Sequence, residues 1–563
     1  MKTINDLKKI LKKSTPEGIN GARKSLYQRM CGDKYCYYND IVLFFDFVSY
    51  KTPELLTMNI GIPIYKWGID SQSLSGIEMY AEDYFFREIA AIIKLFERDN
   101  VVEDSQKEYV QAKLYIQECD SRIVKRTCSY LQDDYVYVKC HCKMPLNGLN
   151  VVPGKKALRM ITDLLKELDQ WMENFNLTQY EDGRKVYVNQ LKIREILKEK
   201  KAVCFIRDGS ILPRDSEGKI EENATPFYAP EEMREVLKLS ENETTAGMLI
   251  KQGITAVTGG AYSGKTTLLE AIQSGIYNHI SGDGREYVIT DESAVKVCAE
   301  DGRPVNNLDI SPFFQEEVNG CSLQKFSAQH TSGSTSQAVN IIEALYAESK
   351  VLLVDEDRSA ANFMHRDEVM RDIIEREPII PFTDRIKEIS TQMGVSLVLV
   401  IGGTSQYFGY ADQVILMDHF KAADITEKVK KFEFADTSKK TLAHWTYTKK
   451  LITKFDKGIL FHSICTKDRA AVFFDDYVSE LTNTGNPFSQ AQLNLLAKVA
   501  GMVLEMGERG EIKEDVDRIL SQVGYGENFG NGDFEQIRQV DVLMCLFRMS
   551  GLEFANEQFF VSW

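Results

Sequence analysis

The sequence contains no long hydrophobic run, no paired-cysteine framework and no excess of positive charge. No stretch of 18 apolar residues occurs in the 563-residue chain, so we expect no membrane domain. Lysines follow the first apolar positions without a hydrophobic segment behind them, which argues against a signal peptide. The 11 cysteines show no disulfide spacing, and such thiols predict a reducing, cytoplasmic location. The net charge of −15 argues against a chain that coats nucleic acid or membranes wholesale.

Three regions differ in their residue patterns. Residues 1–200 mix strand and helix signals, which predicts an α+β domain. Residues 201–430 alternate short apolar strands with helices, which is typical of an α/β domain. Residues 431–563 open with a lysine-rich segment and continue as a mainly helical region, interrupted by a glycine-rich loop at residues 524–532. We therefore expect an α/β core with a domain on either side.

Finer patterns predict local structure within these regions. Runs of apolar residues at 253–258, 351–354 and 396–401 predict strands of a parallel sheet that is buried on both faces. The pairs Asp283-Gly284 and Asp301-Gly302 predict tight turns between antiparallel strands. Cys140 and Cys142 flank His141 on a predicted strand, and we expect thiols packed inward rather than a metal site, because no second cysteine pair completes one.

The strongest chemical signal is a glycine-rich segment between a predicted strand and a predicted helix. Its sequence fits G-x-x-x-x-G-K-[ST], a phosphate-binding loop in which backbone N–H groups cradle phosphate oxygens. Lys265 would reach the β- and γ-phosphates, and the Thr266 hydroxyl would coordinate Mg²⁺. The predicted nucleotide-binding residues here are Gly259, Gly260, Ala261, Tyr262, Ser263, Gly264, Lys265, Thr266 and Thr267.

A second signal is the apolar strand that ends in Asp355-Glu356. An aspartate at the end of such a strand can hold Mg²⁺, and the following glutamate can polarise the attacking water. The sequence therefore predicts Thr266 and Asp355 as metal ligands, with Lys265 and Glu356 as catalytic residues. On its own, a pair of acids at a strand end is also compatible with a plain helix N-terminus.

A third signal, Ser332-Gly333-Ser334, precedes Asp355 by 23 residues, counted from Ser332. These residues open a predicted helix, whose free N–H groups and positive dipole end suit a phosphate. The alternative is an ordinary serine cap of that helix. Asp355 to Asn362 also follow the pattern D-E-P-T-S-A-L-D without a gap.

Together these motifs resemble those of ATP-binding-cassette (ABC) ATPases, and more closely a family of stand-alone predicted ATPases of the ABC class. The resemblance is strong from about residue 200 to 425, and poor in the last hundred residues. It implies an ABC-type P-loop core of a mixed sheet flanked by helices, and ATP bound between two copies of the chain. The stretches that carry it start at Asp208, His279, Ala299, Asp309, Ser332, Asp355, Asn362 and Ile401.

The chain departs from transporter-type domains at several positions. Gly402-Gly403 stands where those domains carry a histidine that senses the γ-phosphate. Gln315 is a candidate for the glutamine of the Q-loop in ABC ATPases, and Tyr228 is a candidate for an aromatic residue that stacks on adenine. These departures leave the predicted ATP site intact and leave the phosphate sensor unassigned.

The function expected from these residues is an ATPase that works as a dimeric clamp or switch with ATP and Mg²⁺. Residues 428–457, from Lys428 to Lys457, contain nine lysines, three acidic residues and interleaved aromatic side chains, which would suit RNA or DNA. A protein partner is an equal alternative for this surface. A scaffold that binds ATP with negligible turnover is a second function, whereas small-molecule kinases lack the motif at Ser332.

Overall fold

The computed structural model describes residues 2–12, 21–47, 56–99, 113–144, 152, 154–221, 223–318, 320–434, 447–454, 463–467, 470–506, 511–523, 533–550 and 553–559. The chain divides into two compact units. Unit 1 contains residues 1–185 and 523–536, and unit 2 contains residues 186–522 and 537–563. The boundary near residue 185 falls inside helix α5 (Leu177–Glu199). No helix in the described part of the chain is long and apolar enough to cross a membrane.

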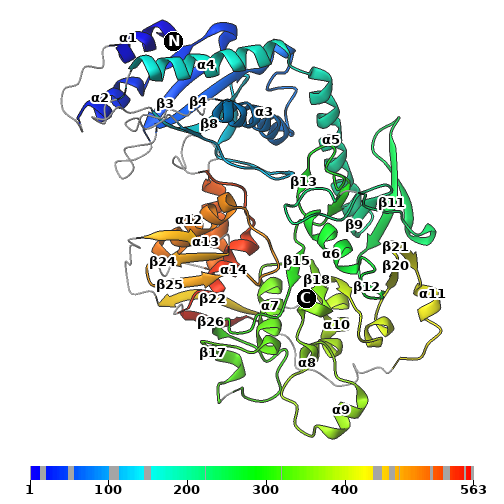
Figure 1. The fold of residues 1–563 in the computed structure, drawn as a ribbon. Coiled ribbons are helices and arrows are strands. Elements are labelled where there is room, and N and C mark those ends of the chain that lie inside the picture. The colour runs from blue at the N-terminus through cyan, green and yellow to red at the C-terminus, as the bar shows by residue number, and fades with distance from the viewer. Residues whose placement is uncertain are drawn as a thin grey trace. The chain divides into compact units, whose positions relative to one another are not determined.

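Unit 1 is built on a sheet of mostly antiparallel strands in the order β1-β2-β3-β4-β8-β5, with β7 also paired to β8. The central strands are β3 (Val42–Phe47), β4 (Leu56–Pro63) and β8 (Tyr135–Lys143), and every residue of β4 is buried. Cys140 and Cys142 are both buried, as predicted. The His141 ring forms hydrogen bonds with the Thr57 hydroxyl and the Asp533 carboxylate. Helices α3 (Glu78–Asp99) and α4 (Gly154–Glu173) pack in the same unit (Figure 1).

Unit 2 contains the predicted parallel sheet, in the order β15-β18-β19-β12-β20-β21. Four neighbouring pairs are parallel, and only β20 with β21 is antiparallel. The strands are β12 (Ile254–Gly259), β15 (Val295–Val297), β18 (Val351–Asp355), β19 (Ser396–Val400), β20 (Gln413–Asp418) and β21 (Lys421–Asp424). The three apolar runs in the sequence therefore form adjacent strands, as expected.

The residues of β18 alternate between two hydrophobic cores. Leu352 and Val354 face one core, which includes residues of α7 (Gly333–Tyr346), α10 (Phe382–Thr391) and α14 (Gln539–Phe547). Val351 and Leu353 face the other, which includes α6 (Lys265–Ser274) and a second sheet. That sheet is antiparallel, in the order β10-β11-β9-β14, from β9 (Ala202–Arg207), β10 (Arg234–Lys238), β11 (Thr244–Lys251) and β14 (Val288–Thr290). Coverage on both faces explains why the strands are continuously apolar.

The predicted hairpins between residues 282 and 310 are wrong. β14 pairs with β9, β15 joins the parallel core sheet beside β18, and β16 (Val305–Leu308) pairs with the distant β17 (Phe326–Ala328). Neither Asp-Gly pair therefore closes a hairpin. Burial in the core determines the pairing of β15, because Val295 and Val297 are buried in the core sheet, and the local turn sequence cannot specify that position.

The predicted helices of the C-terminal region are α12 (Gln490–Met506), α13 (Ile512–Gln522) and α14, whereas the strands of this region were not predicted. A small sheet of β23 (Ile464–Lys467), β24 (Ala471–Phe474) and β25 (Tyr477–Glu480) precedes α12, and β22 (Tyr447–Lys454) pairs with β26 (Glu553–Phe559). The predicted glycine-rich loop at 524–532 lies outside the described residues. Val540 and Met544 of α14 belong to the same core as α7, so these helices form part of unit 2 (Figure 1).

Candidate functional site

The phosphate-binding loop connects the end of β12 to the start of α6. Gly259 has φ 146°, and a Cβ there would lie 2.2 Å from the Met417 carbonyl oxygen, so only glycine fits. Gly264 also has a positive φ, of 99°. The Lys265 ammonium group donates to the carbonyl oxygens of Gly259 and Gly260, both at 2.8 Å, which holds it over the loop. All nine residues predicted here for nucleotide binding thus lie on one loop and the first turn of one helix.

Asp355 ends β18, the strand two places from β12, and its side chain approaches the phosphate-binding loop. The Thr266 hydroxyl lies 3.5 Å from the Asp355 carboxylate. Asp355 is 1 % exposed, and burial raises the pKa of its carboxyl group above the ordinary value, although the Asp357 N–H and Thr266 oppose this. A buried carboxylate beside a hydroxyl offers the oxygen ligands that Mg²⁺ prefers, with phosphate and water completing the shell. These two residues therefore fit the predicted ion.

Glu356 follows Asp355 and reaches toward the loop after β19. One of its carboxylate oxygens accepts hydrogen bonds from the N–H groups of Gly402, at 2.5 Å, and Gly403, at 2.7 Å. Two successive backbone N–H groups on one oxygen form an anion-binding concavity. The loop in which the sequence lacks a phosphate-sensing histidine is therefore the loop that holds Glu356.

Ser332 is the N-cap of α7, where its hydroxyl accepts from the Thr335 N–H at 3.4 Å. Ser332 is exposed, and Gly333 and Ser334 are partly exposed. α7 leads through a short connection into β18, so its N-terminus lies at the carboxyl edge of the sheet, where the phosphate-binding loop also begins. The structure thus supports the role of Ser332 as a helix cap. It also leaves the residues at the start of α7 accessible to solvent.

Gln337 on α7 is fully buried and connects α7 to the segment that follows Glu356. Its side chain donates to the Ser359 hydroxyl at 2.9 Å and accepts from the Ala360 N–H at 2.8 Å. Ser359 in turn donates to the Asp355 carbonyl at 2.7 Å. Gln337 is a functional candidate that the sequence motifs alone did not single out, although it lies at the end of the motif that begins at Ser332.

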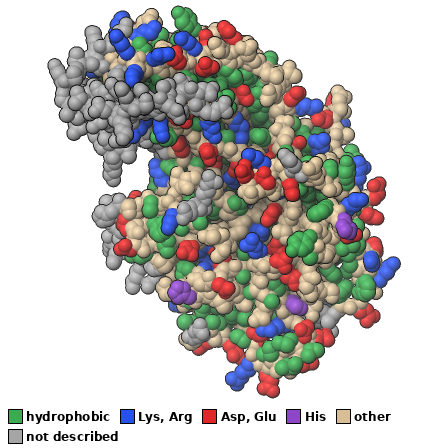
Figure 2. All heavy atoms as spheres, in the orientation of Figure 1, with side chains coloured by type: hydrophobic (Ala, Val, Ile, Leu, Met, Phe, Trp, Pro, Cys, Tyr) green, Lys and Arg blue, Asp and Glu red, His purple; other side chains and the backbone are tan. Residues whose placement is uncertain are grey.

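The other sequence candidates lie apart from this cluster. Gln315 is exposed, and its N–H bonds the Pro378 carbonyl. Tyr228 is 64 % exposed. In the predicted nucleic-acid segment, residues 435–446 and 455–457 lie outside the described residues, while Lys430 pairs with Glu427. On the face shown in Figure 2, basic and acidic side chains of the described residues are interspersed.

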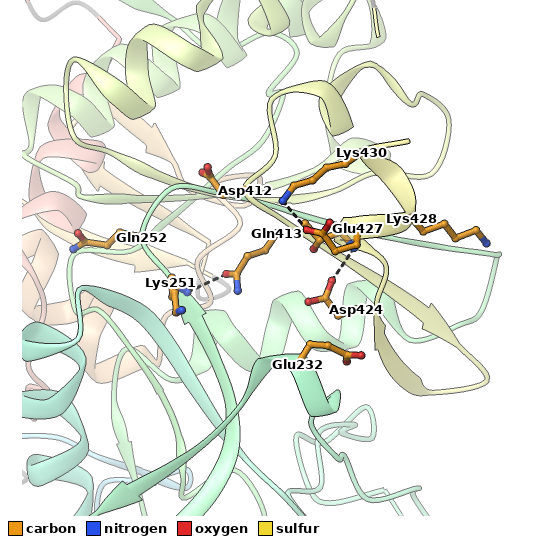
Figure 3. A pocket seen from close by; sticks show the side chains of 10 residues that line it. Glu232, Lys251, Gln252, Asp412, Gln413, Asp424, Glu427, Lys428 and Lys430 are labelled. Atoms are coloured by element: carbon orange, nitrogen blue, oxygen red, sulfur yellow. Dashed lines mark hydrogen bonds and ion pairs between the residues drawn. The ribbon is translucent and has the colours of Figure 1, made fainter. Parts of the chain in front are cut away.

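A pocket of about 520 Å³ opens at the opposite edge of the core sheet, beside Gln252, which precedes β12, and Asp412, which precedes β20. Many of its polar groups already bond within the protein (Figure 3). Asp412 accepts from the Ile254 N–H, Gln413 from the Lys251 N–H, and Glu427 from Lys430. Ligands of open parallel sheets bind beyond the carboxyl ends of the strands, so this pocket is distinct from the candidate nucleotide site.

Comparison with known proteins agrees with this geometry. The family model of the ABC_ATPase P-loop domain matches residues 177–451. These residues, just under half of the chain, have the ABC-type P-loop fold. The matched region includes the loop that begins at Gly259, for which the sequence predicts phosphate binding. Among the described residues, no group of three or more His, Cys, Asp or Glu side chains is placed to hold a metal ion.

Part of the chain is similar to a curated protein and to solved structures. The chain is 33 % identical over 223 residues to the uncharacterized protein MJ1628 of Methanocaldococcus jannaschii, a match that covers 38 % of this chain and 49 % of that protein. The chain thus spans about half the length of this curated relative. Among solved structures, it is similar to cbiO1 from Clostridium perfringens, part of the ABC transporter complex cbiONQ, with 16 % identity, a TM-score of 0.26, and coverage of 41 % of this chain and 91 % of that one. It is also similar to the ADP conformation of MJ1267, an ATP-binding cassette of an ABC transporter, with 13 % identity, a TM-score of 0.25, and coverage of 41 % and 94 %.

Proposed function

We propose that this chain binds Mg-ATP and hydrolyses it between two copies of itself, as a dimeric clamp. The observation that carries the proposal is the meeting of Lys265, Thr266, Asp355 and Glu356 at the carboxyl edge of one sheet, with the accessible first turn of α7 at the same edge. The phosphate-binding loop would hold ATP in one copy. Ser332, Gly333 and Ser334 of the other copy would contact its γ-phosphate.

Each side chain has a distinct task in this site. Lys265 stabilises negative charge on the β- and γ-phosphates, and the loop N–H groups hold the remaining oxygens. Thr266 and Asp355 would hold Mg²⁺, which neutralises phosphate charge when it is bound. Glu356 orients the attacking water, and the Gly402 and Gly403 N–H groups fix the direction of its carboxylate. Catalysis of this kind depends on positioning and preorganised charge, so closure of the clamp controls the rate.

The proposal is tested by light scattering after size exclusion, with Mg-ATP and the full chain. We expect Glu356→Gln to dimerise with Mg-ATP, because hydrolysis no longer opens the clamp, and to stay monomeric without nucleotide. Adding Ser332→Arg should keep the chain monomeric even with Mg-ATP, because the arginine blocks the opposite site. Dimers in both variants regardless of nucleotide, or no dimer in either, would contradict the sandwich.

The alternative function is a scaffold that binds ATP with negligible turnover. It predicts nucleotide binding without phosphate release that depends on Glu356. Measuring phosphate release by the wild type and by Glu356→Gln separates the two functions, because only the ATPase loses activity in the variant. Contact of RNA, DNA or a protein with residues 428–457 stays a prediction, to be tested by adding each partner to the ATP-bound dimer.

A further inference from the structure

The turn between β20 and β21 places an exposed aromatic ring directly beside the phosphate-binding loop. Asp418 pairs with Lys421, so His419 and Phe420 form a two-residue hairpin turn. The Phe420 N–H donates to the Ser263 carbonyl at 3.2 Å. A Cβ on Gly264 would lie 3.1 Å from the Phe420 ring, so the ring borders the start of α6. Despite this contact, Phe420 remains 54 % exposed.

This turn is built from residues that are unfavourable for its shape. Both turn residues have positive φ, 45° for His419 and 63° for Phe420. Two-residue hairpins prefer asparagine or glycine at such positions, and a bulky residue with positive φ is a genuine outlier. A glycine pair would make the same turn without strain. Phe420 therefore occupies a position whose backbone conformation is unfavourable for a bulky side chain. Residues with such strained backbone conformations cluster at ligand sites.

The order of the strands fixes which end of a nucleotide the ring would meet. β18 and β19 lie on one side of β12 and supply Asp355, Glu356 and the Gly402–Gly403 loop, whereas β20 lies on the other side. A triphosphate whose γ end faces Glu356 must direct its α-phosphate and nucleoside toward β20. The register pairs Gly259 with Met417, so the turn at Phe420 projects just beyond the loop that carries the phosphates.

We propose that the Phe420 ring stacks on the purine base of the nucleotide whose phosphates the loop at Gly259 to Thr266 holds. This inference rests on the proposed function. It assigns the base contact to the β20–β21 turn instead of Tyr228. An aromatic face that is half exposed and rigidly anchored stacks on a base at little cost in conformational freedom. Stacking of this kind tolerates any base, so the ring contributes affinity and does not select adenine over guanine.

The test compares ATP with inorganic tripolyphosphate, which carries the phosphates without a base. Dissociation constants are measured by calorimetry with Mg²⁺ on the full chain. We expect Phe420→Ala to weaken ATP binding roughly tenfold, since a stacked base contributes on that order, and to leave tripolyphosphate binding unchanged. Phe420→Trp should bind ATP like the wild type. Phe420→Gly should match Phe420→Ala, because it removes the ring while it relieves the backbone.

A matched control is His419→Gly, which changes the same strained turn and leaves the ring in place, and we expect it to keep wild-type affinity. Equal loss of ATP and tripolyphosphate in Phe420→Ala would mean that the ring only braces the loop, and would overturn the assignment. So would unchanged ATP binding, or a loss confined to Tyr228→Ala. A wild-type chain that binds neither ligand would reject the proposed function itself, and the stacking assignment with it.

Discussion

The Glu356 carboxylate accepts hydrogen bonds from two backbone N–H groups, so a methyl group added at either glycine tests how strongly its position matters. A Cβ at Gly403 would lie 2.9 Å from a Glu356 carboxylate oxygen, whereas a Cβ at Gly402 would lie 3.8 Å away, an ordinary contact. We expect Gly403→Ala to displace the carboxylate and lower kcat for ATP hydrolysis about tenfold or more, with little change in ATP affinity. Steady-state kinetics and calorimetry measure the two quantities.

The control for this prediction is Gly402→Ala, for which we expect a much smaller loss of kcat. The loss in Gly403→Ala should also vanish in the Glu356→Gln background, because the two changes act on one group. An increase in KM for ATP with unchanged kcat would show that Gly403 serves nucleotide binding and does not orient Glu356.

At the scale of elements, the C-terminal helix α14 is joined to the helix that begins at Ser332 by a buried polar network. Arg548 donates to Glu300 at 2.5 and 3.0 Å and to Asn340 on α7 at 3.0 Å. Arg303 pairs with Glu343 on α7 at 2.9 Å and donates to Asn340. Burial tends to raise the pKa of Glu300, but Arg548 lowers it below the ordinary value. Since a depressed carboxyl pKa stabilises the ionised folded state, this contribution is present at neutral pH and is lost on acidification through the folded pKa.

We expect Arg548→Met to destabilise unit 2 by roughly 3–5 kcal/mol at neutral pH, because it leaves the Glu300 charge buried without its main partner. The double variant with Glu300→Gln should recover much of that loss, since the unpaired charge is gone. Calorimetric unfolding, with hydrogen exchange of α7 as a local probe, measures both effects. A loss that is equally large in the double variant would argue that packing, and not charge, accounts for it.

The sequence predicts elements that are determined locally and misses those that depend on distant partners. The strands before Gly259 and Asp355 were predictable because both faces of the sheet are apolar, and the loop at Gly259 because phosphate binding demands a fixed pattern. The place of β15 in the core sheet was not predictable, because three residues that include Lys296 resemble an exposed strand. The position of Phe420 beside Ser263 depends on the β12–β20 register, which no local pattern contains.

At the scale of the whole molecule, the proposed clamp needs two copies that complement each other. We expect chains with Lys265→Ala and chains with Ser332→Ala, which removes the hydroxyl without blocking assembly, to have little activity separately, because each site in their dimers lacks one half. A mixture should regain up to about a quarter of wild-type activity, because half of the dimers, if assembly is random, contain one complete site. Phosphate release across mixing ratios measures this, and activity that never exceeds the sum of the separate chains would contradict a shared site.

The buried pairing of Arg548 with Glu300 also bears on how the protein is made. The residues that surround Glu300 leave the ribosome long before Arg548, which lies 248 positions later in the chain. Until Arg548 is synthesised, the nascent chain contains the Glu300 carboxylate without the arginine that pairs with it in the folded protein. We therefore expect chains that end before residue 548 to carry the phosphate-binding loop in a domain with an incomplete interior, and to be cut by proteases more readily than the full chain.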